Sequence, residues 1–353
     1  MHSFKTIDGT IVAYGDIWQV CMTPSIYALL QYMLLFDYDT VAHKTAYFTG
    51  YAVSDDIASH LPGVWIPMQQ TGVNPSVRRL INKFFFRLTA NMRYPFLRNS
   101  HIFAFDVGFV PPLIGKKKYS LLSDGPLGIS QNMQSDSAEY MRQQRRRNSL
   151  RGCIETALLG PVAVSGWGNN DQCVEFFMTE ENQCLVFKNK PVHINSLRQL
   201  WNDAQEETRN FVKHVFNVGE QDIAILNSRP YMFCTQPIVK DGIMTEEEYV
   251  DLLCPIFNRY GTSKLLLKLH PRDTFDYTKY FPEVAIYHKK VNMQLLVLLG
   301  ANVERVGTIC SSSVNSFPES VDIDWYGTRR HPKLLAWFGD AVPPYRKYND
   351  LPY

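Results

Sequence analysis

Residues 264–273 read KLLLKLHPRD, and this stretch decides the fold class that the sequence predicts. Residues 265–269 are a short apolar run of the kind that forms a buried strand, and His270 with Pro271 ends the run abruptly. Largely apolar strands are typical of parallel sheets that helices cover on both faces. An ionisable imidazole at the point where such a strand surfaces marks a place where a ligand can bind.

Strand and helix patterns alternate on both sides of this stretch. Further strands are expected at 17–22, 45–49, 64–67, 102–105, 119–122, 231–234, 305–310 and 321–326. Helices are expected at 27–35, 75–91, 196–216, 245–260 and 293–299. This alternation predicts an α/β protein with parallel sheets.

The length of the chain allows two domains. With 353 residues, of which 45% are hydrophobic, the chain can bury two ordinary cores. We expect an N-terminal α/β domain at 1–195, a linker helix region at 196–225 and a C-terminal α/β domain at 226–353.

Composition narrows the class of protein. Lys+Arg 36 against Asp+Glu 34 gives a net charge of +2, too small for the broad basic surface of a nucleic-acid-binding protein. Seven cysteines are scattered without the spacing of a zinc site or a disulfide scaffold, which indicates a reducing compartment. No secretory signal is visible at the N-terminus, and no apolar stretch is long enough to cross a bilayer. We therefore expect a cytoplasmic protein, and a homodimer is compatible with this composition.

One charge run stands out, RQQRRRNSLR at 142–151. At helical spacing its arginines would cover most of a helix surface. One interpretation is a solvated surface, and the other is peripheral contact with a polyanion such as the lipid headgroups on the inner face of a membrane. The arginines concerned are Arg142, Arg145, Arg146, Arg147 and Arg151.

Polar residues follow four of the expected strands, where ligands of open parallel sheets bind. The clusters are 123–125 (SDG), 235–237 (TQP) followed by 240–242 (KDG), 270–273 (HPRD) and 311–313 (SSS). Taken singly, Asp-Gly is a common turn dipeptide and serine a common helix N-cap. Together they supply the parts for moving a group off a phosphate: hydroxyls and amides for its oxygens, an imidazole for the leaving group, and a carboxylate for the proton of an incoming hydroxyl.

Competing motifs are weak. The sequence has no P-loop and no dinucleotide fingerprint, and Ser165–Gly168 lacks the glycine pattern of a hydrolase nucleophile elbow. The DxD at 322–324 lies in an apolar run and is interpreted as strand alternation, and His331 is interpreted as part of a loop. No His, Cys, Asp and Glu set has metal-ligand spacing.

Four segments resemble glycosyltransferase family 52, the family of bacterial lipooligosaccharide and capsule sialyltransferases. They are VCMTPSIYALL (20–30), TQPIVKDGIMTEEEYVDL (235–252), KLLLKLHPRDTFDYTKYFPEV (264–284) and VGTICSSSVNSFPESVDIDWYG (306–327). The resemblance implies a GT-B-like fold, two Rossmann-like domains whose parallel sheets face a central cleft. It also implies an inverting sialyltransferase that moves sialic acid from CMP-sialic acid to a galactoside hydroxyl of a surface glycan or glycolipid. No cofactor and no metal are expected, because a departing CMP carries little charge to neutralise.

The resemblance also implies roles for single residues. His270 would contact or protonate the CMP phosphate. Thr23, Pro24 and Ser25 would lie near the substrates. The donor-binding set would be Thr235, Gln236, Pro237, Pro271, Arg272, Ser311, Ser312 and Ser313.

The general base is a choice between Asp124 and Asp241. The family motif has two acidic residues before a glycine, but Ser123 precedes Asp124 here and Lys240 precedes Asp241. The position of Asp124 in the N-terminal domain favours it. Two alternatives stay open: a hexosyltransferase of the same fold that uses another nucleotide sugar, and a non-catalytic protein that binds nucleotides or glycans.

Overall fold

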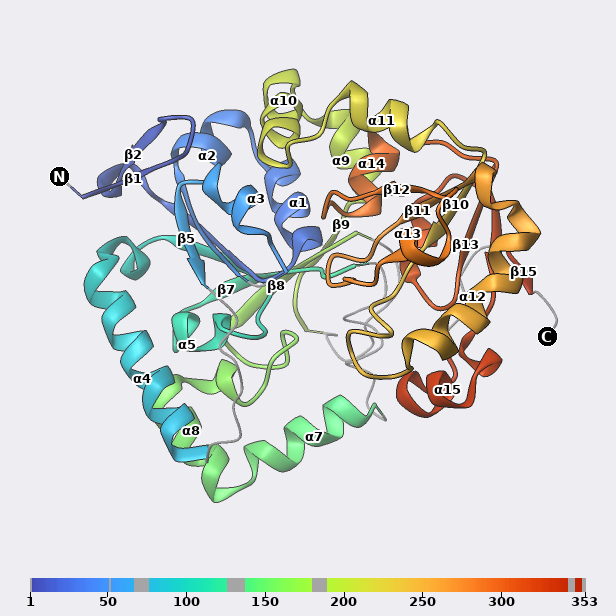
Figure 1. The fold of residues 1–353 in the computed structure, drawn as a ribbon. Coiled ribbons are helices and arrows are strands. Elements are labelled where there is room, and N and C mark those ends of the chain that lie inside the picture. The colour runs from blue at the N-terminus through green and yellow to red at the C-terminus, as the bar shows by residue number, and fades with distance from the viewer. Residues whose placement is uncertain are drawn as a thin grey trace. The chain divides into compact units, whose positions relative to one another are not determined.

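The computed structural model describes residues 2–50, 52–66, 76–125, 137–179, 189–341 and 347–350. Residues 67 and 75, where a strand and a helix were predicted to end and to begin, and Cys184 lie outside these ranges. The chain divides into two compact units, Met1–Asn217 and Val218–Tyr353, each containing a parallel sheet (Figure 1). The division falls inside the region expected to be the linker.

The first unit holds a sheet whose described strands are all parallel, in the order β5-β4-β3-β6-β7-β8-β9. Its strands are β3 (Gln19–Thr23), β4 (Thr45–Gly50), β5 (Gly63–Ile66), β6 (His101–Ala104), β7 (Tyr119–Leu122), β8 (Cys173–Met178) and β9 (Val192–Ile194). A hairpin of β1 (Ser3–Lys5) and β2 (Ile11–Ala13) precedes the sheet. Strands β8 and β9 were not predicted. Strand β9 is exposed throughout and carries no apolar run.

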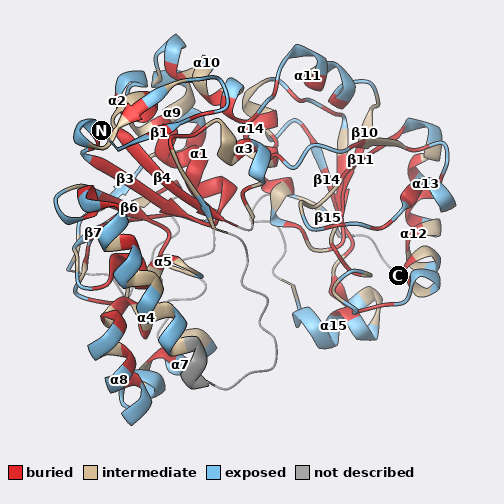
Figure 2. Ribbon diagram, turned by 60° about the vertical axis from the view of Figure 1, so that its left-hand side comes forward, coloured by how far each residue is buried: buried red, intermediate tan, exposed pale blue. Residues whose placement is uncertain are grey.

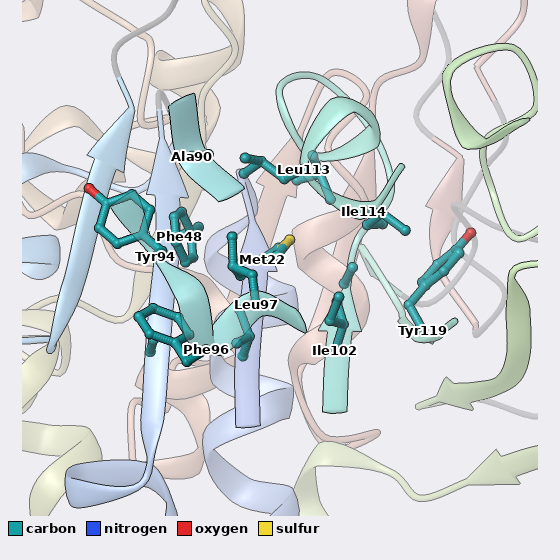
Figure 3. Packing of buried hydrophobic residues seen from close by; sticks show 14 of the residues in the cluster. Met22, Phe48, Ala90, Tyr94, Phe96, Leu97, Ile102, Leu113, Ile114 and Tyr119 are labelled. Atoms are coloured by element: carbon teal, nitrogen blue, oxygen red, sulfur yellow. The ribbon is translucent and has the colours of Figure 1, made fainter. Parts of the chain in front are cut away.

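Helices cover this sheet on both faces. They are α1 (Ile26–Leu35), α2 (Tyr38–His43), α3 (Asp55–Ser59), α4 (Ser76–Arg93), α5 (Val110–Ile114), α7 (Ala138–Arg147), α8 (Leu150–Leu159), α9 (Leu197–Asp203) and α10 (Glu206–Val215). Helix α1 is buried along almost its whole length (Figure 2). On the other face, Ala90 and Leu97 pack over Met22, Phe48 and Ile102 of the strands (Figure 3).

The single helix predicted at 196–216 is wrong. Helix α9 ends at Ala204, whose backbone is extended, and α10 begins after Gln205. Both helices pack against α1 in the first unit. Packing on a neighbouring helix, rather than the polar pattern of the segment, determines where the helix breaks.

The second unit holds a parallel sheet in the order β12-β11-β10-β13-β14-β15. Its strands are β10 (Tyr231–Cys234), β11 (Leu265–Lys268), β12 (Ala285–Tyr287), β13 (Arg305–Thr308), β14 (Asp322–Trp325) and β15 (Asn349–Asp350). Its helices are α11 (Glu220–Leu226), α12 (Glu246–Tyr260), α13 (Tyr277–Tyr280), α14 (Met293–Leu298) and α15 (Pro332–Phe338). In the described part of the chain, no helix is long and apolar enough to cross a bilayer.

The interpretations of the DxD at 322–324 as part of a strand and of His331 as part of a loop are confirmed. Asp322 and Asp324 belong to β14, and the buried Asp324 accepts hydrogen bonds from the Tyr260 hydroxyl at 2.7 Å and from Asn349 Nδ2 at 2.9 Å. His331 is the N-cap of α15, where its Nδ1 accepts from the Lys333 amide at 3.2 Å.

Candidate active site

Three neighbouring strands of the second unit end in polar residues. Strand β10 lies between β11 and β13, and all three run parallel. Thr235 follows β10, His270 follows β11 after one residue, and Ser311 lies just beyond the end of β13. Parallel strands end at the same edge of a sheet, so the structure gathers these three residues as the sequence predicted.

Thr235 is the centre of the hydrogen-bond network at this edge. Its hydroxyl donates to Asp273 Oδ2 at 2.7 Å and accepts from the His270 amide at 3.1 Å. Asp273 is buried, and the Tyr277 hydroxyl donates to the same oxygen at 2.8 Å. These bonds fix the turn that contains His270 against the end of the neighbouring strand β10.

The His270 imidazole is neutral near pH 7. Burial, with the positive charges of Arg272 and Lys268 nearby, lowers the pKa of His270 to about 4. Its Nδ1 accepts a hydrogen bond from the Arg272 amide at 3.1 Å, so the ring proton sits on Nε2. The ring therefore offers a hydrogen-bond donor rather than a positive charge.

The serine cluster begins a short 3-10 helix, η6 (Ser312–Ser316), and not an α-helix. Ser311 Oγ lies 2.7 Å from Ser313 Oγ, and the Ser311 amide donates to Thr308 Oγ1 at 3.0 Å. Thr308 Oγ1 in turn donates to the Cys234 carbonyl of β10 at 3.0 Å. Thr308 thus ties the serine turn to the central strand, while Ser312 is exposed.

The remaining donor residues predicted from the sequence differ in exposure. Pro237 is buried, and its carbonyl accepts from the Asp241 amide at 2.9 Å, which makes it part of a turn. Gln236 and Pro271 are partly exposed at the same edge, where a ligand could contact them. 

Asp241, one of the two candidate bases, is held in an ion pair. Its Oδ1 accepts from Arg272 Nη1 at 2.9 Å. The structure thereby joins a candidate base to a residue predicted to bind the donor. While the ion pair holds, the proton of an acceptor hydroxyl would have to go to the other oxygen of Asp241, Oδ2.

Asp124, the other candidate base, lies at the carboxyl edge of the sheet in the first unit. The Ser25 hydroxyl donates to Asp124 Oδ1 and also accepts from the Ala28 amide at the start of α1. The residue is exposed, yet protein around its carboxyl group raises the pKa of Asp124 to about 6, against the lowering effect of the Ser25 hydrogen bond. A carboxyl group that titrates near neutral pH suits general base catalysis.

Thr23 and Pro24, which precede Ser25 in the chain, are buried. Thr23 Oγ1 accepts from the Ser25 amide at 2.9 Å and fixes the turn between β3 and α1. Gln31 of α1 accepts from the Ser123 amide through Oε1 at 2.9 Å and so ties α1 to the end of β7. Of the three predicted N-terminal contacts, only the Ser25 side chain reaches the candidate base.

Sequence reasoning missed several residues that build these edges. Asp106 follows β6, is buried, and accepts from the amides of Trp167 and Gly168 at 2.7 and 2.9 Å. It thereby holds the loop that was rejected as a nucleophile elbow. Burial lowers the pKa of Lys268 to about 8, and its Nζ donates to the Leu269 carbonyl at 3.0 Å. Both residues carried a visible signal, because Lys268 interrupts an otherwise apolar strand and Asp106 directly follows the strand expected at 102–105.

Among the residues that the structure describes, neither edge contains a cluster of metal ligands. In the ranges that the structure describes, no group of three His, Cys, Asp or Glu side chains lies close enough to hold a metal ion. 

A cavity of about 400 Å3 in the first unit lies away from both edges. Its lining includes His43, two positions before the start of β4, and Pro62, directly before the start of β5. Two carboxylates, Asp8 and Glu207, line the cavity, and Asp8 accepts from the Thr10 amide at 3.0 Å and lies 3.1 Å from His214 Nε2. The cavity is at the opposite end of the sheet from Asp124 and is not the candidate active site.

Comparison with protein families identifies a match over most of the chain. The model for glycosyltransferase family 52 matches residues 107–334, which include both candidate bases, His270 and the serine cluster. An uncharacterized protein of Haemophilus influenzae is 34% identical over 206 residues, 58% of this chain and 64% of that protein. The chain thus spans less than two thirds of the length of this relative.

Comparison with solved structures finds bacterial sialyltransferases at low identity. A 2,6-sialyltransferase of a Photobacterium strain, in ternary complex with CMP and lactose, superposes with a TM-score of 0.55 at 12% identity, covering 87% of this chain and 71% of that one. A sialyltransferase of Photobacterium damsela gives 0.51 at 12% identity, covering 91% and 79%. These similarities confirm the predicted α/β, GT-B-like fold of two units with parallel sheets.

Proposed function

Because the chain belongs to glycosyltransferase family 52, we propose that it is an inverting sialyltransferase that uses CMP-sialic acid as donor and a galactoside as acceptor. The observation that carries this proposal is the joint placement of Thr235, His270 and Ser311 at the ends of three neighbouring strands. That edge offers the neutral hydrogen-bond donors of His270 and the serines, with the guanidinium of Arg272 beside them, to the phosphate of a departing CMP. A site for a more highly charged diphosphate leaving group would need a metal ion or several free cations.

In the proposed reaction, the acceptor hydroxyl oxygen attacks the anomeric carbon of sialic acid as the bond from that carbon to the CMP phosphate oxygen breaks. The electron pair of that bond leaves with CMP. His270 Nε2–H donates a hydrogen bond to the leaving phosphate, and the hydroxyls of Ser311 and Ser313 bind its oxygens. The pKa of Asp124, raised to about 6, supports its role as the base that takes the proton of the hydroxyl.

The donor would be bound by the second unit. Arg272 is exposed and forms an ion pair with Asp241. Its guanidinium would contact the carboxylate or the phosphate of the donor. In this view Asp241 positions Arg272, and Gln236 and Pro271 shape the floor of the site. The galactoside acceptor would approach Asp124 and Ser25 of the first unit.

The test is release of CMP from CMP-sialic acid by the purified protein with lactose as acceptor. We expect CMP and sialyllactose in equal amounts, and CMP formation about a hundredfold slower with the His270→Ala variant. Thermal unfolding with CMP, UDP or GDP separates this proposal from a hexosyltransferase, because only the cognate nucleotide raises Tm. Stabilisation by UDP or GDP alone would reject the CMP donor, and binding of CMP without turnover would favour a non-catalytic protein.

A further inference from the structure

Helix α4 carries an apolar stripe that faces solvent. The exposed fractions are 47% for Ile81, 37% for Phe84, 58% for Phe85, 48% for Leu88 and 73% for Met92. These positions recur at intervals of three or four residues, which places them on one side of the helix. The other side packs on the core through Phe86 and Ala90. The stripe is therefore not explained by the core of the unit.

Helix α8 repeats this arrangement beside α4. Leu150, Ile154 and Leu158 are 80%, 46% and 37% exposed, at intervals of four residues, while Glu155 of the same helix is buried. The two helices pack against each other, and Arg87 Nη1 of α4 donates to the Leu158 carbonyl at 2.7 Å (Figure 1, Figure 2). We call the exposed apolar residues of both helices the docking face: Ile81, Phe84, Phe85, Leu88, Met92, Leu150, Ile154 and Leu158.

Positive charge is concentrated on the same helices. Helix α4 contains five Arg or Lys residues and no Asp or Glu, and α7 with α8 contains five arginines and two glutamates. The three helices therefore carry a net charge of +8, whereas the whole chain has +2, so the rest of the chain is negative. A partner of this region should be negatively charged.

The arginine run at 142–151 divides into two groups. Arg146 Nε and Arg151 Nε donate to the buried Glu155 at 2.9 and 3.0 Å, and the bond from Arg146 joins α7 to α8. Arg145 and Arg147 are exposed and form no ion pair with the residues that the structure describes. Part of the run is thus structural, and part offers positive charge near the apolar stripes.

We propose that the docking face binds the surface of an anionic phospholipid bilayer. Exposed aromatic and aliphatic side chains enter the boundary between headgroups and acyl chains, and the arginines contact lipid phosphates. A second copy of the chain is a poorer partner. A twofold interface brings the same face of both copies together, which would oppose two regions of net charge +8.

Sedimentation with vesicles tests this surface without donor or acceptor, so its outcome is independent of the proposed reaction. We expect the full chain to pellet with phosphatidylcholine vesicles that contain phosphatidylglycerol, and to stay in solution with phosphatidylcholine alone. Phe85→Ser/Leu88→Ser/Leu150→Ser should lower the bound fraction about tenfold or more. Arg145→Gln/Arg147→Gln should lower binding by roughly fivefold for each arginine.

The matched control is Ile225→Ser. Ile225 of α11 is 47% exposed, as is Ile81 of α4, but lies in the other unit, and its replacement should leave vesicle binding unchanged. Equal pelleting of the triple serine variant and the unaltered protein would overturn the proposal. A second result would also overturn it: the unaltered protein does not bind the vesicles, and analytical ultracentrifugation shows a concentration-dependent dimer that the triple serine variant does not form.

Discussion

The carboxyl edges of the two sheets are built from similar residue types but are held in different ways. In the second unit, Thr235, Asp273 and Tyr277 form a buried network, and the His270 ring is fixed by the amide of Arg272. In the first unit, the side chain of Asp124 has a single hydrogen-bond partner among the described residues, Ser25. One edge is thus pre-organised to bind an anion, and the other keeps a carboxylate that is able to gain and lose a proton.

Replacing Asp124 by Asn tests the titrating edge most directly. We expect kcat to fall about a thousandfold, because the amide is unable to accept the proton of the acceptor hydroxyl. Sialyl transfer to lactose is the measurement, and a circular dichroism spectrum checks the fold. Asp241→Asn is the matched control and should affect donor binding more than kcat. If the large loss in kcat occurs in Asp241→Asn instead, the assignment of the base is reversed.

His270→Ala should lower kcat about a hundredfold, through loss of the donor at the leaving phosphate. His270→Gln sharpens the test, since its amide nitrogen is a neutral donor near the position of Nε2. We expect the Gln variant to recover part of the rate that the Ala variant loses. A Gln variant as slow as the Ala variant would mean that a positively charged imidazole is required, contrary to the neutral ring inferred from its pKa of about 4.

Asp273→Asn tests whether the second edge is pre-organised by its buried network. An amide loses charge-assisted acceptance from Thr235 and Tyr277, so we expect a cost of about 1–3 kcal/mol in the free energy of unfolding. The KM for the donor should rise by roughly tenfold with a smaller change in kcat. Denaturant unfolding and donor titration measure both. Asp251→Asn, at an exposed position of α12, serves as the control and should change neither.

The pH dependence of kcat/KM should show an acidic limb near pH 6. Asp124 must be deprotonated to act as a base, so activity falls as the pH drops through its pKa of about 6. The Ser25 hydrogen bond lowers that pKa, so Ser25→Ala should move the limb to higher pH and slow transfer a few-fold below pH 7.

Ser25 also caps α1, and loss of a cap costs about 1 kcal/mol of stability. Ser54→Ala removes the matching cap of α3 and should lower stability without moving the limb. An unchanged limb in Ser25→Ala would mean that the limb does not report on Asp124.

Removal of divalent cations is expected to have the smallest effect. With neutral donors at one edge and a carboxylate base at the other, the proposed reaction needs no metal ion. Transfer in EDTA should therefore equal transfer in magnesium or manganese. Full loss in EDTA with recovery on adding either ion would reject this mechanism.

Much of the fold could be read from local patterns. The strands β7 and β10 have the predicted bounds, and β11 and β13 begin at the predicted residues, because short apolar runs ended by polar residues are strong signals of buried parallel strands. The exposed strand β9 and the break between α9 and α10 could not be found this way. Both depend on neighbours distant in the sequence, β8 for the strand and α1 for the helices.

The candidate site shows the same division. Local sequence was sufficient to place His270 at the end of a core strand and the serines at the start of a helical turn, since strand ends and caps are set by adjacent residues. The state of each ionisable group needed the folded chain. The pKa of Asp124 depends on burial and on Ser25, 99 positions away, and the ion pair of Asp241 depends on Arg272, 31 positions away. The neutral ring of His270 depends chiefly on burial. Electrostatic interactions act through space, so residue types and their order specify which groups are present, and three-dimensional proximity specifies what each can do.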